Sequence, residues 1–80
     1  MGKKQKNITT TISLPPEVHR LMDDLAEKVG ATSKVEVIRR AIGVYDMIVR
    51  SYEQGYDIQQ TKGDESNKII FAELYLLRPK

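Results

Sequence analysis

The chain has 80 residues, of which 40% are apolar and 30% charged, and its 13 basic and 11 acidic side chains leave a net charge of +2. A chain of this length forms one small domain that buries only about 60% of the surface its unfolded form exposes, so one copy is marginally stable. The absence of cysteine excludes disulfides and thiolate metal sites, and the single histidine argues against zinc binding or histidine catalysis.

Other classes of protein are disfavoured by the same sequence. No apolar run approaches the roughly 20 residues that span a membrane, and none near the start resembles a signal-peptide core. No nucleophile–base pair or cluster of metal ligands is visible, so we expect neither an enzyme nor a bound metal or cofactor. The expected setting is a reducing cytoplasm.

The first predicted element is a strand over residues 5–14, where threonine and isoleucine are frequent. Because side chains alternate along a strand, Ile8, Ile12 and Leu14 share one face with Thr10. The other face is polar and carries Gln5, Asn7, Thr9, Thr11 and Ser13. Residues 1–6 form a basic arm with three lysines and no acid, which suits a nucleic-acid partner but is also common in solubility tails.

Two amphipathic helices are predicted after this strand. Pro16 begins the first, its apolar stripe continues to Val29, and Gly30 supplies a left-handed cap. Ser33 and Glu36 have capping-box spacing at the start of the second helix. The hydroxyl is expected to accept the third helical N–H, and the glutamate to accept the N–H of Ser33. The second apolar stripe is wider than one short partner helix can cover.

The last part of the chain is harder to interpret. Tyr56–Thr61 fits a short strand and residues 62–67 fit a turn. The mostly apolar run over residues 68–77 has no period that separates strand from helix. We expect a hairpin.

One strand and two helices cannot pair their own backbone or cover their own apolar faces, so the sequence predicts a twofold dimer. Its strands would pair as an antiparallel ribbon, and its second helices would pack across the axis. The predicted dimer core consists of apolar side chains from the strand and both helices: Ile8, Ile12, Leu14, Leu21, Leu25, Val37, Ile38, Ala41, Ile42 and Tyr45. Such a ribbon fits the major groove of DNA, where amide and hydroxyl side chains can bond base edges. The alternative is an ordinary solvated strand face.

Two stretches carry a family resemblance, residues 10–17 and residues 30–42. An alternating strand, a Pro-Glu helix start, a glycine turn and a Ser-x-x-Glu-Val-Ile-Arg helix together resemble the ribbon-helix-helix family of bacterial and archaeal DNA-binding proteins. The similarity covers about residues 7–53. It implies a mostly α member of the α+β class, an intertwined homodimer with a two-stranded antiparallel N-terminal ribbon.

The resemblance also implies site residues. Thr9, Thr11 and Ser13 would read bases, joined by Asn7, although this set lacks the arginine or lysine that most often contacts guanine. The start of the second helix would bind a phosphate. The expected phosphate contacts are Thr32, Ser33 and Lys34, with Lys4 and Lys6 from the arm.

The predicted organisation is a basic arm (1–6), a ribbon-helix-helix domain for DNA binding and dimerisation (7–54), and a C-terminal extension (55–80). The predicted function is sequence-specific binding of double-stranded DNA as a homodimer, as a transcriptional repressor. Whether dimers associate further on DNA stays open. The alternative is the antitoxin of a toxin–antitoxin pair, in which the apolar run Ile69–Leu77 covers a toxin.

Overall fold

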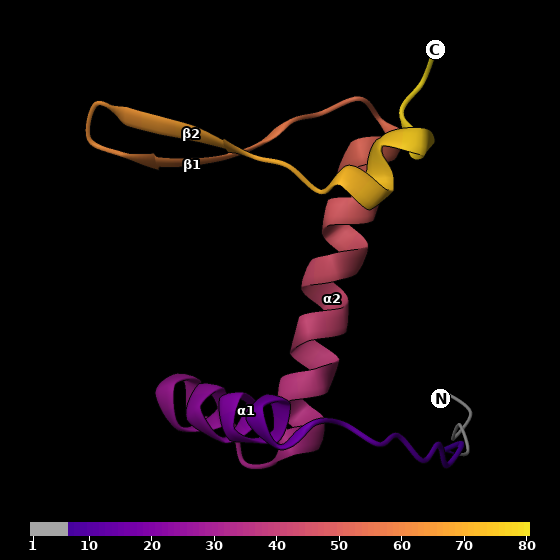
Figure 1. The fold of residues 1–80 in the computed structure, drawn as a ribbon, viewed down its shortest axis with the longest axis vertical. Coiled ribbons are helices and arrows are strands. Elements are labelled where there is room, and N and C mark those ends of the chain that lie inside the picture. The colour runs from indigo at the N-terminus through magenta and orange to yellow at the C-terminus, as the bar shows by residue number, and fades with distance from the viewer. Residues whose placement is uncertain (1–6) are drawn as a thin grey trace, which may run out of the picture.

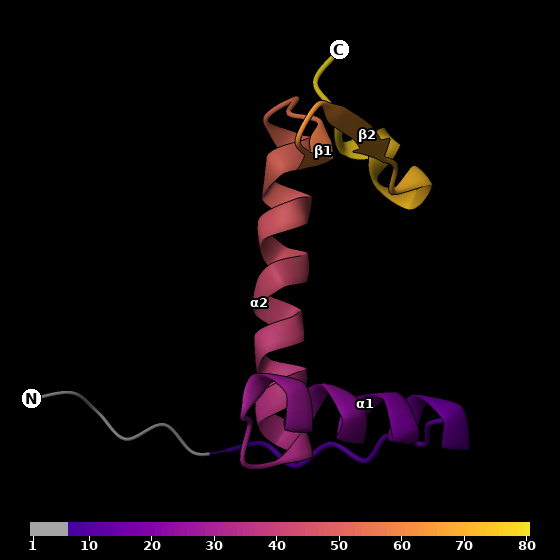
Figure 2. The ribbon, with the colours of Figure 1, turned by 90° about the vertical axis from the view of Figure 1, so that its left-hand side faces the viewer.

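The structure, a computed structural model, describes residues 7–80 (Figure 1). In chain order its elements are helix α1 (Pro16–Val29), helix α2 (Lys34–Glu53), strands β1 (Ile58–Lys62) and β2 (Glu65–Ile69), and the 3-10 helix η1 (Ala72–Leu77). The fold is therefore a small, mostly helical α+β arrangement. α1 lies across the N-terminal end of α2, and the strands and η1 lie at its C-terminal end (Figures 1 and 2).

Helix α1 begins and ends as its sequence predicts. Pro16 lies in the first turn, where its missing N–H costs nothing. The negative charge of Glu17 beside it interacts favourably with the positive end of the helix dipole. Gly30 ends the helix in the left-handed conformation with φ 68°. Its N–H and the N–H of Ala31 both donate to the carbonyl of Ala26, which satisfies the end of the helix.

Helix α2 is the long element of the molecule, and its 20 residues span about 30 Å at 1.5 Å per residue. Ser33 is its N-cap, and the Ser33 hydroxyl accepts the N–H of Glu36 at 3.2 Å, as predicted. The helix ends at Glu53, and Gly55 follows with φ 86°, a conformation that glycine adopts without strain.

A hairpin follows α2, which confirms one expectation and corrects another. β1 and β2 pair antiparallel with Ile58 opposite Ile69 and Lys62 opposite Glu65. The turn holds only Gly63 and Asp64, not residues 62–67, because Gly63 has φ 56° and a glycine in that conformation closes a two-residue loop. The apolar run predicted over residues 68–77 divides between the end of β2 and η1.

The core that one chain completes lies at the C-terminal end of α2. Ile48 and Tyr52 from α2 pack against Leu74 from η1, with Val49, Ile58 and Phe71 around them. Tyr52 is only 1% exposed, and its hydroxyl oxygen accepts the N–H of Phe71 at 3.0 Å. The Tyr52 and Phe71 rings meet edge to face, with centroids 6.3 Å apart.

Arg78 fastens the end of the chain to this core. Its guanidinium lies 4.8 Å from the centre of the Tyr52 ring and 5.2 Å from that of Tyr75, in cation–π contact with both. It also donates to the carbonyl of Tyr56 at 2.9 Å and to the Asp57 carboxylate at 2.5 Å. These contacts join η1 to the segment that leads into β1. We call residues 54–80 the C-terminal unit.

The predicted N-terminal strand is not formed by one chain, so the predicted strand-helix-helix order is not confirmed. Residues 7–15 have no regular secondary structure, and the two-stranded sheet of residues 7–80 follows the helices instead of preceding them. Ile8 is 89% exposed and Ile12 62% exposed. A strand needs another backbone to satisfy its N–H and C=O groups, and no strand within residues 7–80 pairs with this segment.

The described chain does not close on itself. Its Cα radius of gyration is 16.5 Å, whereas a compact domain of 80 residues has about 12 Å. Figures 1 and 2 show why: α1 and the C-terminal unit lie at opposite ends of α2 and do not meet. The apolar side chains in the middle of α2 are therefore largely exposed to solvent, with Ile42 63% and Tyr45 46% exposed.

We predict that Tyr52→Phe loosens the C-terminal unit. The change leaves the partly buried N–H of Phe71 without its acceptor, which costs about 1–3 kcal/mol. Hydrogen exchange of the Phe71 amide should accelerate accordingly, because this unit can open without unfolding α1. Tyr56→Phe is the matched control, since that side chain is 62% exposed. Unchanged exchange at Phe71 in Tyr52→Phe would contradict the assigned hydrogen bond.

Candidate nucleic-acid interface

The segment over residues 7–15, which we call the polar arm to distinguish it from the basic arm of residues 1–6, and the start of α2 lie at the same end of the molecule. The segment over residues 7–15 leads into α1 and passes the N-terminal end of α2, where the turn between the two helices also lies (Figures 1 and 2). Asn7, Thr9, Thr11 and Ser13, the predicted base contacts, are all exposed. Lys4 and Lys6, two of the predicted phosphate contacts, lie outside the described residues.

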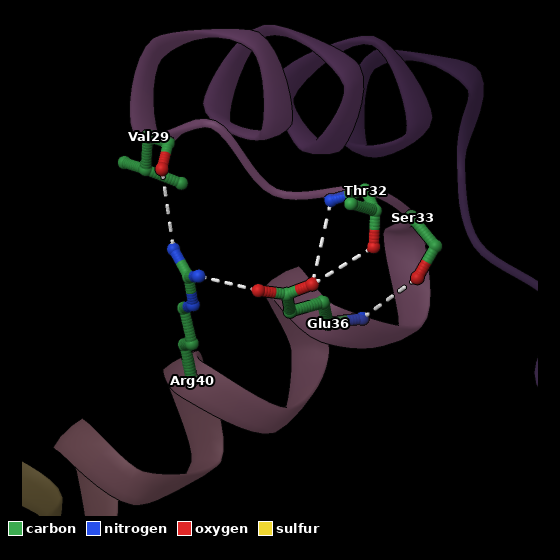
Figure 3. Close-up of polar contacts among 5 residues, drawn as sticks. All are labelled: Val29, Thr32, Ser33, Glu36 and Arg40. Carbon is green, nitrogen blue, oxygen red and sulfur yellow. Dashed lines mark hydrogen bonds and ion pairs between the residues drawn. The ribbon is translucent and has the colours of Figure 1, made fainter.

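The turn between α1 and α2 is held by a small polar network (Figure 3). Glu36 accepts two hydrogen bonds from Thr32 through one carboxylate oxygen, from the N–H at 3.3 Å and from the hydroxyl at 3.0 Å. Its other oxygen binds the guanidinium of Arg40. Arg40 in turn donates to the carbonyl of Val29 at 3.4 Å, so the last residue of α1 is joined to the second turn of α2.

This network corrects half of the predicted capping box. Ser33 accepts the N–H of Glu36 as expected, but Glu36 does not bond the N–H of Ser33 and reaches Thr32 instead. The Thr32 hydroxyl adds a second donor there, and Arg40, four residues after Glu36, draws the other oxygen toward itself. The N–H of Ser33 is therefore not occupied by this carboxylate.

The same contacts set the charge of the turn. The two hydrogen bonds from Thr32, and then the Arg40 guanidinium, hold the pKa of Glu36 below its ordinary value of 4.5. Glu36 is therefore ionised at neutral pH, and Arg40 balances its charge. The turn keeps the positive end of the α2 dipole beside a paired carboxylate.

The three predicted phosphate contacts of the turn differ in what they can offer an anion. Thr32 already donates both its N–H and its hydroxyl to Glu36. The hydroxyl proton of Ser33 stays available, because that side chain acts as an acceptor toward Glu36. Lys34 lies 3.6 Å from the Asp23 carboxylate, an exposed pair that water screens and that a phosphate can replace. Ser33 and Lys34, with the first free N–H groups of α2, form the stronger part of the predicted site.

The residues predicted as dimer core are mostly uncovered in one chain. Val37 alone among them is buried, and Leu14 is half-buried. The others are exposed: Ile8, Ile12, Leu21, Leu25, Ile38, Ala41, Ile42 and Tyr45. The residues that one chain does bury, Met22, Ile48, Tyr52 and Leu74, were not in the predicted set. The first three do belong to the apolar stripes that helical spacing predicts, whereas Leu74 belongs to a run whose period is ambiguous.

One contact that holds the C-terminal unit together had no signal in the sequence. The contact of Arg78 with Asp57 joins residues 21 positions apart, and no local pattern predicts it. The apolar run proposed as a toxin-binding segment is partly folded into the core, since Leu74 is buried, but Leu76 is 96% exposed.

Within residues 7–80, no helix is long and apolar enough to cross a membrane, and no three potential metal-ligating side chains form a cluster.

Comparisons with protein-family models, with curated proteins and with solved structures found no match to this chain.

We predict that Glu36→Gln makes folding stability less dependent on pH in the acid range. Because the folded pKa of Glu36 is depressed, its contribution is complete above the ordinary value and is lost as the pH falls through the folded value. The wild type should thus exceed the variant in stability at neutral pH and converge with it in acid. Chemical denaturation from pH 7 downward measures this difference. Glu27→Gln, on the exposed face of α1, serves as the control, and a constant offset at every pH would contradict the prediction.

Proposed function

We propose that this protein is a dimeric, sequence-specific DNA-binding regulator of the ribbon-helix-helix type, acting as a transcriptional repressor. The observation that carries the proposal is the combination of an unpaired polar arm with an unfinished apolar surface around the same end of α2. Neither feature is stable alone in water. Pairing two chains along the arm resolves both.

The surface area of one chain supports a second copy as the partner. The chain exposes 7525 Å². A compact protein of 9.1 kDa exposes about 4,900 Å². The excess of roughly 2,600 Å² is well above the approximately 800 Å² that each partner buries in a standard interface. An obligate dimer, in which folding and association are one event, accounts for a difference of this size.

Pairing of two arms would make residues 7–14 an antiparallel ribbon. Ile8 and Ile12, now exposed, would turn toward the helices, and Thr9 and Thr11 would face outward on the alternate face. A two-stranded ribbon fits the major groove. Asn7 suits adenine, and the threonine methyl groups suit the methyl group of thymine, so A·T pairs are the expected contacts of this ribbon.

The start of α2 would fix the ribbon on the DNA backbone. Ser33 and Lys34 lie at the positive end of the α2 dipole, beside the arm, and offer a hydroxyl, an ammonium group and free N–H donors. Such contacts orient a protein on the duplex without reading its sequence. A dimer held in this way over a promoter would block access of other proteins to it, which is the basis of repression.

The proposal is tested by binding to the DNA upstream of the protein's own gene in graded salt. We expect a linear fall of the logarithm of the binding constant with the logarithm of salt concentration, and tighter binding to one site than to random DNA. Equal affinity for the site and for random DNA would contradict sequence-specific regulation.

We predict that Thr11→Ala weakens binding to the specific site by about 1–3 kcal/mol, with little change on random DNA. The reason is the loss of one base contact per chain. Thr10→Ala is the matched control, because this neighbouring threonine belongs to the opposite face of the proposed ribbon. Lys34→Ala should instead weaken binding to every sequence and reduce the salt slope by about one. Electrophoretic mobility shift in a salt series measures all three, and equal effects of Thr10→Ala and Thr11→Ala on specificity would exclude the ribbon mode.

We also predict that Ile12→Lys abolishes dimerisation. Ile12 is 62% exposed in one chain, so its replacement would cost a monomer little. In the paired ribbon it would bury a charge in the apolar interior, at a cost of several kcal/mol. Sedimentation at micromolar concentration should show a dimer for the wild type and a monomer or unfolded chain for the variant. Ser13→Lys, on the outward face, is expected to remain dimeric.

A further inference from the structure

The free N–H groups at the start of α2 lie next to a carboxylate. In the described part of the chain, no hydrogen bond uses the N–H groups of Ser33, Lys34 and Val35. Glu36 is close to them, because its own N–H donates to the Ser33 hydroxyl and its side chain bonds the preceding residue, Thr32. A carboxylate in this position can compete with a phosphate for the same donors.

The side chain of Glu36 does not take the position that its spacing from the N-cap favours. In a capping box, the carboxylate accepts the N–H of the N-cap residue, which is Ser33 here. Oε2 of Glu36 instead accepts both donors of Thr32, and Oε1 binds the guanidinium of Arg40. Figure 3 shows Arg40 on the side of this carboxylate away from Ser33. Because Thr32 occupies only Oε2, Arg40 is the partner that keeps Oε1 from the N–H of Ser33.

Arg40 is itself held from α1. One nitrogen of its guanidinium binds Glu36, and the other donates to the carbonyl of Val29, the last residue of α1, at 3.4 Å. The planar guanidinium can serve both acceptors at once, whereas a lysine ammonium is a single point of charge. A lysine at this position would still be a neighbour of Glu36, four residues earlier on the helix. Substitution can therefore separate the ion pair from the bond to Val29.

We propose that Arg40 is a positioning residue for DNA binding, because it holds the Glu36 carboxylate away from Ser33 and leaves that end of α2 to a phosphate of the DNA. This inference rests on the proposed function, since it concerns the same backbone contacts. Without Arg40, Oε1 of Glu36 would accept the N–H of Ser33. An uncompensated negative charge would then lie beside the phosphate and repel it. Binding to every DNA sequence would weaken, although Arg40 itself touches no DNA.

Electrophoretic mobility shift on the specific site and on random DNA tests this role. Arg40→Met should weaken binding to both at least tenfold. Adding Glu36→Ala to Arg40→Met removes the competing carboxylate and returns the net charge to that of the wild type, so binding should recover to within threefold. Arg40→Lys should also bind within threefold of the wild type, because the ammonium can still pair with Glu36.

Two comparisons separate this role from loss of charge and from a structural role. Arg39→Met is the matched control, because it removes the same charge from an exposed neighbour that forms no ion pair within residues 7–80. It should weaken binding less than threefold. A merely structural Arg40 predicts that the double variant stays impaired, since it lacks the bonds to both Val29 and Thr32. An impaired double variant, or equal losses in Arg39→Met and Arg40→Met, would overturn the proposal.

Inorganic phosphate supplies a measurement that does not require sequence recognition. Its addition should shift the amide NMR signals of Ser33, Lys34 and Val35 in the wild type, not in Arg40→Met, and again in the double variant. If the signals behave in this way but the wild type binds no DNA, the role of Arg40 holds and the proposed function fails. If the wild type binds its site specifically and Arg40→Met binds it equally well, the ribbon proposal stands and the role of Arg40 is wrong. Signals that phosphate leaves unchanged in the wild type would also overturn this role.

Discussion

The width of the apolar stripe on α2 controls the shape of this protein. α1 covers the stripe near Val37, and η1 with β1 covers it near Ile48 and Tyr52. Between them Ile42 is 63% exposed, and Tyr45 is 46% exposed although its hydroxyl donates to Glu73 of η1 at 3.5 Å. A helix with water-exposed apolar side chains in its middle gains little from folding alone, because most helical stability comes from burial of such a stripe. The extended shape of the chain and the dimer proposed for it both follow from these uncovered apolar side chains of α2.

Much of the local structure could be predicted from sequence because it is encoded by neighbouring residues. Pro16 and Gly30 mark the ends of α1, and Ser33 marks the start of α2, through backbone effects that depend on one residue each. The fold class was predicted only in its coarse form, a mostly helical α+β chain. The ribbon that would define the finer class needs a second backbone, and one chain cannot show it.

The errors of sequence-based prediction had both local and long-range causes. The turn of the hairpin was placed too broadly, because the polar residues 65–67 fit a loop as well as an exposed strand. The apolar run after it was ambiguous, and its division was decided by Tyr52, which binds the N–H of Phe71 from 19 positions away. In the candidate site, the contact of Glu36 with Thr32 was not predicted, since the carboxylate has more than one N–H or O–H donor within reach.

Helix α2 also separates two sets of evolutionary constraints. Its 20 residues place the turn at Ser33 about 30 Å from the C-terminal unit. Side chains at one end therefore cannot touch a ligand held at the other, and each end can change its chemistry without altering the other. A lineage could acquire a new recognition specificity in the arm while its distal unit diverged independently, and the long helix would remain the common frame of both.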